Sequence, residues 1–283
     1  MDELTGRTAV ITGAASGMGR AFADRFSAAG MNLVLADIEQ APLDDAVAEL
    51  SGSGAQVIGV RTDVSDGDQV DALAAAAFER FETVNVVCNN AGVAAGGRIA
   101  DLAVADWEWV LGVNVWGVVH GLRAFLPHLI AHGDGHVVNT ASVAGHTSPP
   151  GMAPYNASKH AVVTISETLY NELTADGSTV GVTVLCPGLV STRIMESDRN
   201  RPEQLPKAGI ELSPEDELRR AAITELFAAA KPPAEVADLV HDAILAKQLY
   251  LFTDDVFLES IRTRHECIQH MRNPDASTAG LFD

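Results

Sequence analysis

The chain opens with a short apolar segment, a glycine-rich turn and a helical segment. Residues 7–12 are apolar, the turn reads Gly13-Ala14-Ala15-Ser16-Gly17-Met18-Gly19, and residues 20–29 have a helical periodicity that Gly30 ends. Glycines let the backbone approach a phosphate group closely at the N-terminus of a helix, where unpaired N–H groups and the helix dipole favour anions. The sequence therefore predicts a phosphate-binding turn between a strand and a helix, although such a turn can also be a plain tight connection.

The same alternation of strand and helix continues through most of the 283 residues. Further strands are predicted at 32–36, 56–60, 84–88, 136–140, 180–186 and 249–253. Helices are expected at 66–81, 101–130, from Tyr155 onward, and at 214–230, 233–247 and 256–271. Regular repeats of this kind favour a parallel sheet with helices on both faces. We therefore predict one α/β domain over residues 1–283 with a Rossmann-type, doubly wound sheet, whose ligands bind at the carboxyl ends of the strands.

Three segments depart from this regular pattern. Asn114 lies in the middle of the expected helix 101–130, and Pro127 is expected to bend or end that helix. Residues 189–230 are polar, irregular and too long for a plain connector, which favours a substrate lid. Residues 254–283 form a C-terminal extension whose end, from Asn273, is expected to be frayed.

Charge and composition narrow the classes of function. A formal net charge of -19 disfavours nucleic acid and anionic membranes as partners. No apolar run approaches the roughly 20 residues that span a bilayer, and the start Met1-Asp2-Glu3 lacks the basic region of a signal peptide. The cysteines, at positions 88, 186 and 267, have no paired spacing, and His128 and His132 have no evident third ligand. We predict a cytoplasmic protein without a metal site.

Asp37 follows the second predicted strand, eighteen residues after Gly19. A carboxylate at this position can accept hydrogen bonds from both hydroxyls of an adenosine ribose and would repel a 2′-phosphate. None of the neighbouring residues Ala15, Ser16, Ile38 and Glu39 supplies a positive charge. The sequence therefore favours NAD over NADP, the alternative being that Asp37 is only a turn residue at a strand end.

Tyr155 and Lys159 lie one helical turn apart on one face of a predicted helix. A phenol has a pKa of about 10, and a charge about 4 Å away contributes about 4 kcal/mol at an effective dielectric of 20, or about three pKa units. Lys159 is therefore expected to make Tyr155 a proton donor and acceptor near neutral pH. Alone the pair is weak evidence, because a Tyr and a Lys at this spacing are usually surface residues.

Four separated motifs together resemble the classical short-chain dehydrogenase/reductase family from about residue 7 to residue 253. They are Thr12-Gly13-x-x-x-Gly17-x-Gly19, Asn89-Asn90-Ala91-Gly92, Ser142 thirteen residues before the tyrosine, and Tyr155-x-x-x-Lys159. The resemblance implies that Tyr155 is the general acid/base, that Lys159 lowers its pKa and binds the nicotinamide ribose, and that Ser142 holds the substrate oxygen. It implies that Asn114 positions a water. Ala141 stands where many members carry a second serine.

The same resemblance implies a set of residues around the cofactor. The glycine turn and Asp37 would contact the phosphates and adenosine, and the residues after the later strands would contact the adenine, the ribose and the nicotinamide. The expected cofactor-binding residues are Gly13, Ser16, Gly17, Met18, Gly19, Asp37, Asp63, Val64, Asn90, Ala91, Gly92, Tyr155, Lys159, Pro187, Gly188, Val190 and Thr192.

The expected activity is NAD-dependent interconversion of a secondary alcohol and a ketone. Two alternatives stay open: an NADP-linked carbonyl reductase, which Asp37 disfavours, and a dinucleotide-binding sensor, which would be expected to lack Ser142, Tyr155 or Lys159. The apolar lid residues Ile194, Met195, Leu205, Ile210 and Leu212 favour a hydrophobic or bulky alcohol. By family analogy we expect a homodimer or homotetramer. Trp107, Trp109 and Trp116 are expected in the core or a subunit interface, and the charged run 211–220 on a solvated helix face or beside the substrate opening.

Overall fold

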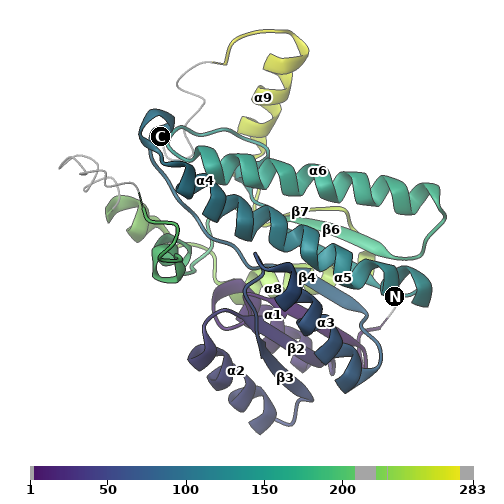
Figure 1. The fold of residues 1–283 in the computed structure, drawn as a ribbon. Helices are drawn as coiled ribbons and strands as arrows, with labels where there is room; N and C mark the ends of the chain where they lie inside the picture. The colour runs from purple at the N-terminus through teal and green to yellow at the C-terminus, as the bar shows by residue number, and fades with distance from the viewer. Residues whose placement is uncertain (1–2, 208–220, 228, 275–283) are drawn as a thin grey trace.

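A computed structural model describes residues 3–207, 221–227 and 229–274. Its centre is one parallel sheet in the order β3-β2-β1-β4-β5-β6-β7 (Figure 1). The strands are β1 Thr8–Thr12, β2 Asn32–Asp37, β3 Val57–Arg61, β4 Val86–Asn89, β5 His136–Thr140, β6 Gly181–Cys186 and β7 Tyr250–Phe252. The chain runs outward from β1 to β3 and then returns to β4, so the strand order reverses between β1 and β4. The doubly wound sheet predicted from the sequence is confirmed.

Helices cover both faces of the sheet (Figure 1). The pairs α1·α8, α3·α5 and α4·α6 pack against each other. Their bounds are α1 Gly17–Ala28, α2 Gln40–Gly52, α3 Gly67–Phe81, α4 Val104–Leu111, α5 Gly117–His132, α6 Ala153–Ala175 and α8 Pro233–Ala246.

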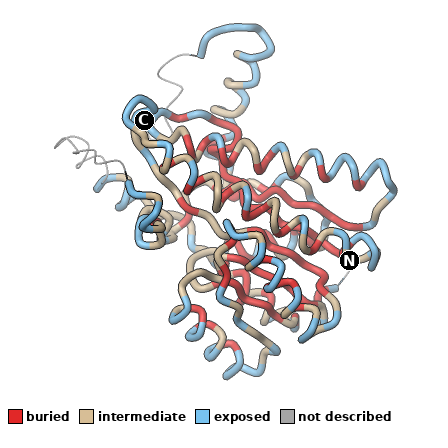
Figure 2. Tube along the Cα trace, in the orientation of Figure 1, coloured by how far each residue is buried: buried red, intermediate tan, exposed pale blue. Residues whose placement is uncertain are grey.

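Successive residues of one strand enter opposite layers of the core, because side chains alternate across a pleated sheet. Ile11 packs with Phe22 and Phe26 of α1, whereas its neighbour Val10 packs with Phe125 of α5 on the other face. Figure 2 shows the resulting continuous buried layer along the strands. Because both faces are covered, the strands are apolar throughout rather than alternately polar, which is why they were visible in the sequence.

The helix expected over 101–130 is divided. A 3-10 turn, Ile99–Asp101, precedes α4, and a π-helical turn, Gly112–Trp116, joins α4 to α5. Pro127 does not end α5, which continues to His132. Pro127 and Arg123 both lie on the exposed face, where the carbonyl that a proline leaves without a helical partner can be hydrated.

Among the described residues, the continuous helical stretch Val104–His132 is the one that is long and apolar enough, by length and composition alone, to cross a membrane. In this fold several of its apolar residues belong to the core, while Val104, Trp116 and Ile130 are exposed. Val118, Phe125 and Leu129 are buried against the sheet and the neighbouring helices, as in the core helix of a globular domain.

In the segment 189–230, which the sequence predicts to be a substrate lid, Ile194–Asn200 form the 3-10 segment η4 and residues 221–227 are helical. Residues 214–220 and 228 of the helix predicted at 214–230, the whole charged run 211–220, Ile210 and Leu212 lie outside the described residues, and residues 229–230 are not helical. The C-terminal extension forms α9, Leu258–Gln269, which has no buried residue and projects from the body of the molecule (Figure 1).

Candidate active site

The glycine turn is packed tightly against the loop after β4. Gly13 and Gly17 have positive φ angles of 65° and 55°, which L-residues with side chains rarely adopt. A Cβ on Gly13 would lie 2.9 Å from the Cα of Ala91, and one on Gly19 would lie 2.1 Å from the carbonyl oxygen of Gly13. The hydroxyl of Thr12 accepts hydrogen bonds from the backbone N–H groups of Asn90 and Ala91 at 2.9 and 3.1 Å. These contacts bring the two loops together at the point where the strand order reverses.

One cleft runs along the carboxyl ends of the strands and contains nearly all of the predicted cofactor residues. Gly19 is the exception, because it packs beneath the turn and does not line the cleft. The predicted residues that line it are Gly13, Ser16, Gly17, Met18, Asp37, Asp63, Val64, Asn90, Ala91, Gly92, Tyr155, Lys159, Pro187, Gly188, Val190 and Thr192. Ser142 also lines this cleft.

Tyr155 and Lys159 project from the first turns of α6 into the cleft, opposite Ser142 at the end of β5. The Lys159 ammonium is buried, lies 5.5 Å from the centroid of the Tyr155 ring, and donates to the carbonyl oxygen of Thr140 at 2.8 Å. The Ser142 hydroxyl accepts from the N–H of Ala144 at 3.1 Å. The structure thus assembles the phenol, ammonium and hydroxyl at one position.

The pKa values of this pair differ from the expectation. Burial raises the pKa of Tyr155, although a hydrogen bond with Ser142 acts to lower it. The sequence predicts the opposite direction, but here Lys159 lies over the ring and donates to the carbonyl of Thr140. Burial also lowers the pKa of Lys159 to about 8. At neutral pH the phenol is therefore protonated and most of the lysine is charged.

Asn114 lies in the π-helical turn and does not line the cleft. Its amide donates to the carbonyl of Val93 and to the hydroxyl of Ser158, both at 3.0 Å, and its oxygen accepts from the N–H of Val93 at 2.9 Å. A Cβ on Gly92 would be 3.5 Å from the Asn114 oxygen and 3.6 Å from Lys159 Nζ. Asn114 therefore fixes the loop after β4 to α6, directly behind the lysine.

Asp37 stands at the opposite end of the cleft, where β2 ends. Its two carboxylate oxygens accept from the N–H groups of Ala15 at 2.9 Å and Glu39 at 3.0 Å. Burial raises the pKa of Asp37, while these backbone hydrogen bonds oppose the shift. The carboxylate is thus held beside the glycine turn, with its oxygens fixed by backbone N–H groups.

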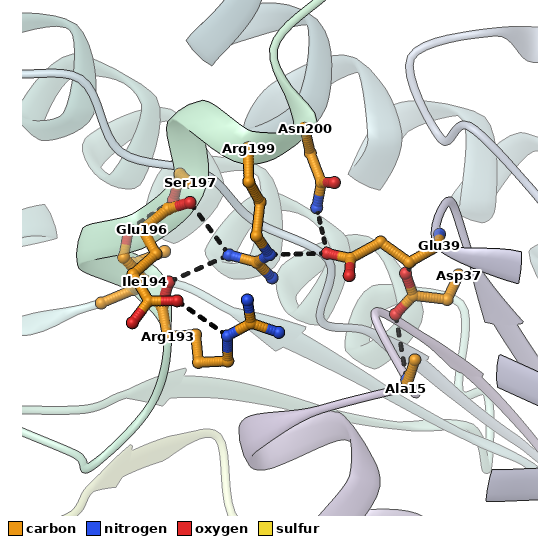
Figure 3. A network of polar contacts seen from close by, with 9 residues as sticks. All are labelled: Ala15, Asp37, Glu39, Arg193, Ile194, Glu196, Ser197, Arg199 and Asn200. Atoms are coloured by element: carbon orange, nitrogen blue, oxygen red, sulfur yellow. Dashed lines mark hydrogen bonds and ion pairs between the residues drawn. The ribbon is translucent and has the colours of Figure 1, made fainter. Parts of the chain in front are cut away.

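The lid brings two arginines to this cleft, Arg193 and Arg199, that the sequence did not associate with it. Arg199 Nε lies 2.7 Å from Glu39 Oε1, and Asn200 donates to the same oxygen at 2.6 Å (Figure 3). Glu39 is 160 residues from Arg199 and 161 from Asn200 in sequence, so no local pattern could have joined it to them. The sequence neighbours of Asp37 carry no positive charge, but Arg193 and Arg199, which are far from it in sequence, line the same cleft.

A third arginine of the lid, Arg201, does not line the cleft and pairs with Asp106 instead. Its Nη1 lies 2.8 Å from Asp106 Oδ1, and the exposed fractions of the two side chains are only 6% and 3%. This contact is an ion pair by distance, without hydrogen-bond alignment. The guanidinium lies 4.9 Å above the Trp109 ring, and its Nε donates to the carbonyl of Leu205. Trp109 is buried and lines the cleft, so Arg201 supports one of its walls.

The structure also places the histidines, cysteines and tryptophan that the sequence analysis considered. The rings of His128 and His132 stack at 6.1 Å, and His128 also contacts Phe78. No group of three or more His, Cys, Asp or Glu that could hold a metal occurs among the described residues. Cys88 and Cys186 are fully buried, which raises the pKa of both thiols. Trp116 is 55% exposed on the outer surface rather than in the core.

Comparison with known proteins agrees with this geometry. The chain matches the family model for short chain dehydrogenases over residues 7–203. A 1-deoxy-11-beta-hydroxypentalenate dehydrogenase from Streptomyces arenae is 42% identical over 195 residues, covering 67% of this chain and 69% of that protein. A CLA biosynthesis dehydrogenase/reductase from Lactiplantibacillus plantarum is 30% identical over 283 residues, covering 97% of each. The crystal structure of a short chain dehydrogenase/reductase from Burkholderia phymatum in complex with NAD has a TM-score of 0.93 and 46% identity, covering 97% of this chain and 98% of that chain.

Proposed function

This chain belongs to the short-chain dehydrogenase/reductase family, and from that premise we propose that it interconverts a secondary alcohol and a ketone with NAD as its cofactor. The observation that carries the proposal is the joint position of Ser142, Tyr155 and Lys159 on one cleft with the glycine turn and Asp37. A sensor without chemistry would have no need of this set.

The cleft fits a dinucleotide. The turn at the start of α1 has no side chains at Gly13, Gly17 and Gly19, so its N–H groups can approach a pyrophosphate. Asp37 at the far end can accept from ribose hydroxyls, since each carboxylate oxygen has a second lone pair besides the one that takes a backbone N–H. The solved relative from Burkholderia phymatum is a complex with NAD, which supports NAD over NADP.

The bound dinucleotide would accept a hydride from the alcohol carbon or return it to the carbonyl carbon. Tyr155 would exchange the proton of the substrate oxygen, and Ser142 would hold that oxygen while charge develops on it. Because the pKa of Tyr155 is raised, its protonated form at neutral pH suits donation to a carbonyl oxygen. Oxidation needs the phenolate, so the oxidation rate is expected to increase with pH.

The wall of the cleft supports a hydrophobic or bulky substrate. Ile194 and Met195 of the lid line it together with Trp109 and Phe227. Leu205 packs on Val93, Trp109 and Val110 and so supports this wall from behind. Trp116 and Tyr170 are exposed on the helices that the family commonly uses for assembly, which supports a homodimer or homotetramer. We also propose a cytoplasmic location.

The test is a Tyr155→Phe variant assayed for NADH formation over cyclic, aromatic and steroidal secondary alcohols. General acid/base groups contribute about 10²–10⁴-fold, so turnover should fall by at least about 100-fold while NADH still binds. Tyr250→Phe is the matched control, because the Tyr250 hydroxyl bonds Glu167 and does not line the cleft. Full activity of Tyr155→Phe would reject the proposal.

A further inference from the structure

The lid crosses the adenosine end of the cleft and is attached there to a single carboxylate. Figure 3 shows Arg199 and Asn200 converging on Glu39, two residues after Asp37. The Glu39 side chain caps none of the N–H groups of α2, although Glu39 occupies the N-cap position. Its carboxylate therefore serves the lid instead of the helix it precedes.

The Arg199 side chain is held at a defined position. Its Nε bonds Glu39, and its Nη1 donates to the carbonyl oxygens of Arg193 and Glu196 at 3.2 and 3.1 Å. The backbone N–H of Glu39 donates to Asp37, so the two acidic residues are also connected to each other. Arg199, Asn200 and Asp37 all line the cleft at this end.

A guanidinium at this position matters for the choice of cofactor. Arginine binds phosphate oxygens with directed, charge-assisted hydrogen bonds, and a 2′-phosphate is what distinguishes NADP from NAD. Asp37 alone would repel that phosphate, but an unneutralised Arg199 beside it would offset the repulsion. The ion pair with Glu39 removes this attraction, because it both neutralises the guanidinium and occupies its Nε.

We propose that Glu39 is a second cofactor-discriminating residue, which acts by holding Arg199 in an ion pair so that Arg199 does not bind a 2′-phosphate. Discrimination then has two components: Asp37 repels the phosphate directly, and Glu39 withholds the arginine that would attract it. This inference rests on the proposed preference for NAD.

The experiment measures binding rather than turnover. Dissociation constants for NADH and NADPH are determined by quenching of tryptophan fluorescence for the wild type, Glu39→Gln, Arg199→Gln and the double variant. In Glu39→Gln the ratio of the NADPH to the NADH dissociation constant should fall about tenfold, the size of one charge-assisted hydrogen bond. In the double variant the ratio should return to about the wild-type value, because the effect acts through Arg199.

A matched control separates this effect from a general change of charge. Glu259→Gln removes the same charge from an exposed pair with Arg262 on α9, outside the cleft, and should leave the ratio unchanged. The inference is overturned if Glu39→Gln leaves the ratio unchanged, or if the double variant keeps the altered ratio. A wild type that binds NADPH more tightly than NADH would instead reject the proposed NAD preference, and the inference with it.

Discussion

Two arginines of the lid, Arg199 and Arg201, each form an ion pair with a carboxylate. The two pairs have the same chemistry but differ in burial and in their position relative to the cleft. Arg199 and Glu39 meet at the edge of the cleft, where the side chains keep 26% and 21% of their exposure. Arg201 and Asp106 meet in the interior, beneath Trp109. Water competes with the first pair and screens it, whereas the second pair has lost most of its water.

This difference gives the two ion pairs of the lid different tasks. An exposed pair contributes only about 0–1 kcal/mol to folding stability, so the pair of Arg199 with Glu39 is not what holds the lid in place. A buried pair adds little net stability compared with apolar residues, but breaking it leaves a charge without water or partner. Arg201 therefore fixes the position of the lid, and Arg199 governs what the cleft accepts.

The largest expected effect is from Arg201→Met. The substitution keeps much of the side-chain volume but leaves the buried Asp106 carboxylate unpaired, which should lower the free energy of unfolding by about 3–5 kcal/mol in urea titrations. Adding Asp106→Asn removes the stranded charge and keeps an oxygen for the N–H of Ala103, so most of the loss should be recovered. If the double variant is as unstable as the single one, the lost packing on Trp109 is responsible rather than the charge.

Lys159 extends the comparison to a buried cation whose ammonium donates to a carbonyl oxygen. Its pKa is lowered from 10.5 to about 8, so between these values the unfolded chain binds more protons and stability rises with pH. From pH 7.5 to 9.5 this single group should raise the free energy of unfolding by about 2 kcal/mol. The measurement stops below pH 10, because the raised pKa of Tyr155 makes the folded state less stable as the unfolded phenol ionises.

The control for this prediction is the same pH series on Lys159→Met, which lacks the titrating group. The difference in free energy of unfolding between wild type and variant should change across the series by that amount in favour of the wild type. A constant difference would show that the lysine has an ordinary pKa in the folded protein.

The smallest effect is expected from Arg199→Gln. Because this pair is exposed, the free energy of unfolding should change by less than about 1 kcal/mol, and the change should vanish in 1 M salt, where the screening length is about 3 Å. The effect of Arg201→Met should persist in the same salt. An Arg199→Gln loss equal to that of Arg201→Met would remove the distinction between the two pairs.

Local sequence patterns were sufficient to predict the strands and the three residues of the candidate active site. The strands were visible because both faces of the sheet are covered and whole segments such as 8–12 are apolar. Ser142, Tyr155 and Lys159 were found from short motifs, and the fold places all three on one cleft. The opposite direction of the Tyr155 pKa could not be anticipated, since it depends on burial and on the position of Lys159 over the ring.

The lid contacts were not predictable for a related reason. Glu39 and Asp106 precede helices or lie in their first turns, where acidic residues are ordinary, and nothing near them in sequence indicates an arginine partner. The one available signal was an irregular, polar segment rich in arginine, and it predicts a lid without predicting its attachments. The π-helical turn was also missed, because a helical periodicity does not reveal one additional residue.

That additional residue determines which side of the helix reaches the cleft. Each helical residue advances the chain by about 100° around the helix axis. The wider turn at Gly112–Trp116 therefore rotates the side chains of α4 about this axis relative to the side chains of α5. It lets α5 bury Phe125 and Leu129 in the sheet core while α4 directs Asp106 and Trp109 toward the lid. A chain one residue shorter here could form an unbroken α-helix, but Asp106 and Trp109 would then be rotated by about 100° relative to α5 and away from their contacts with Arg201.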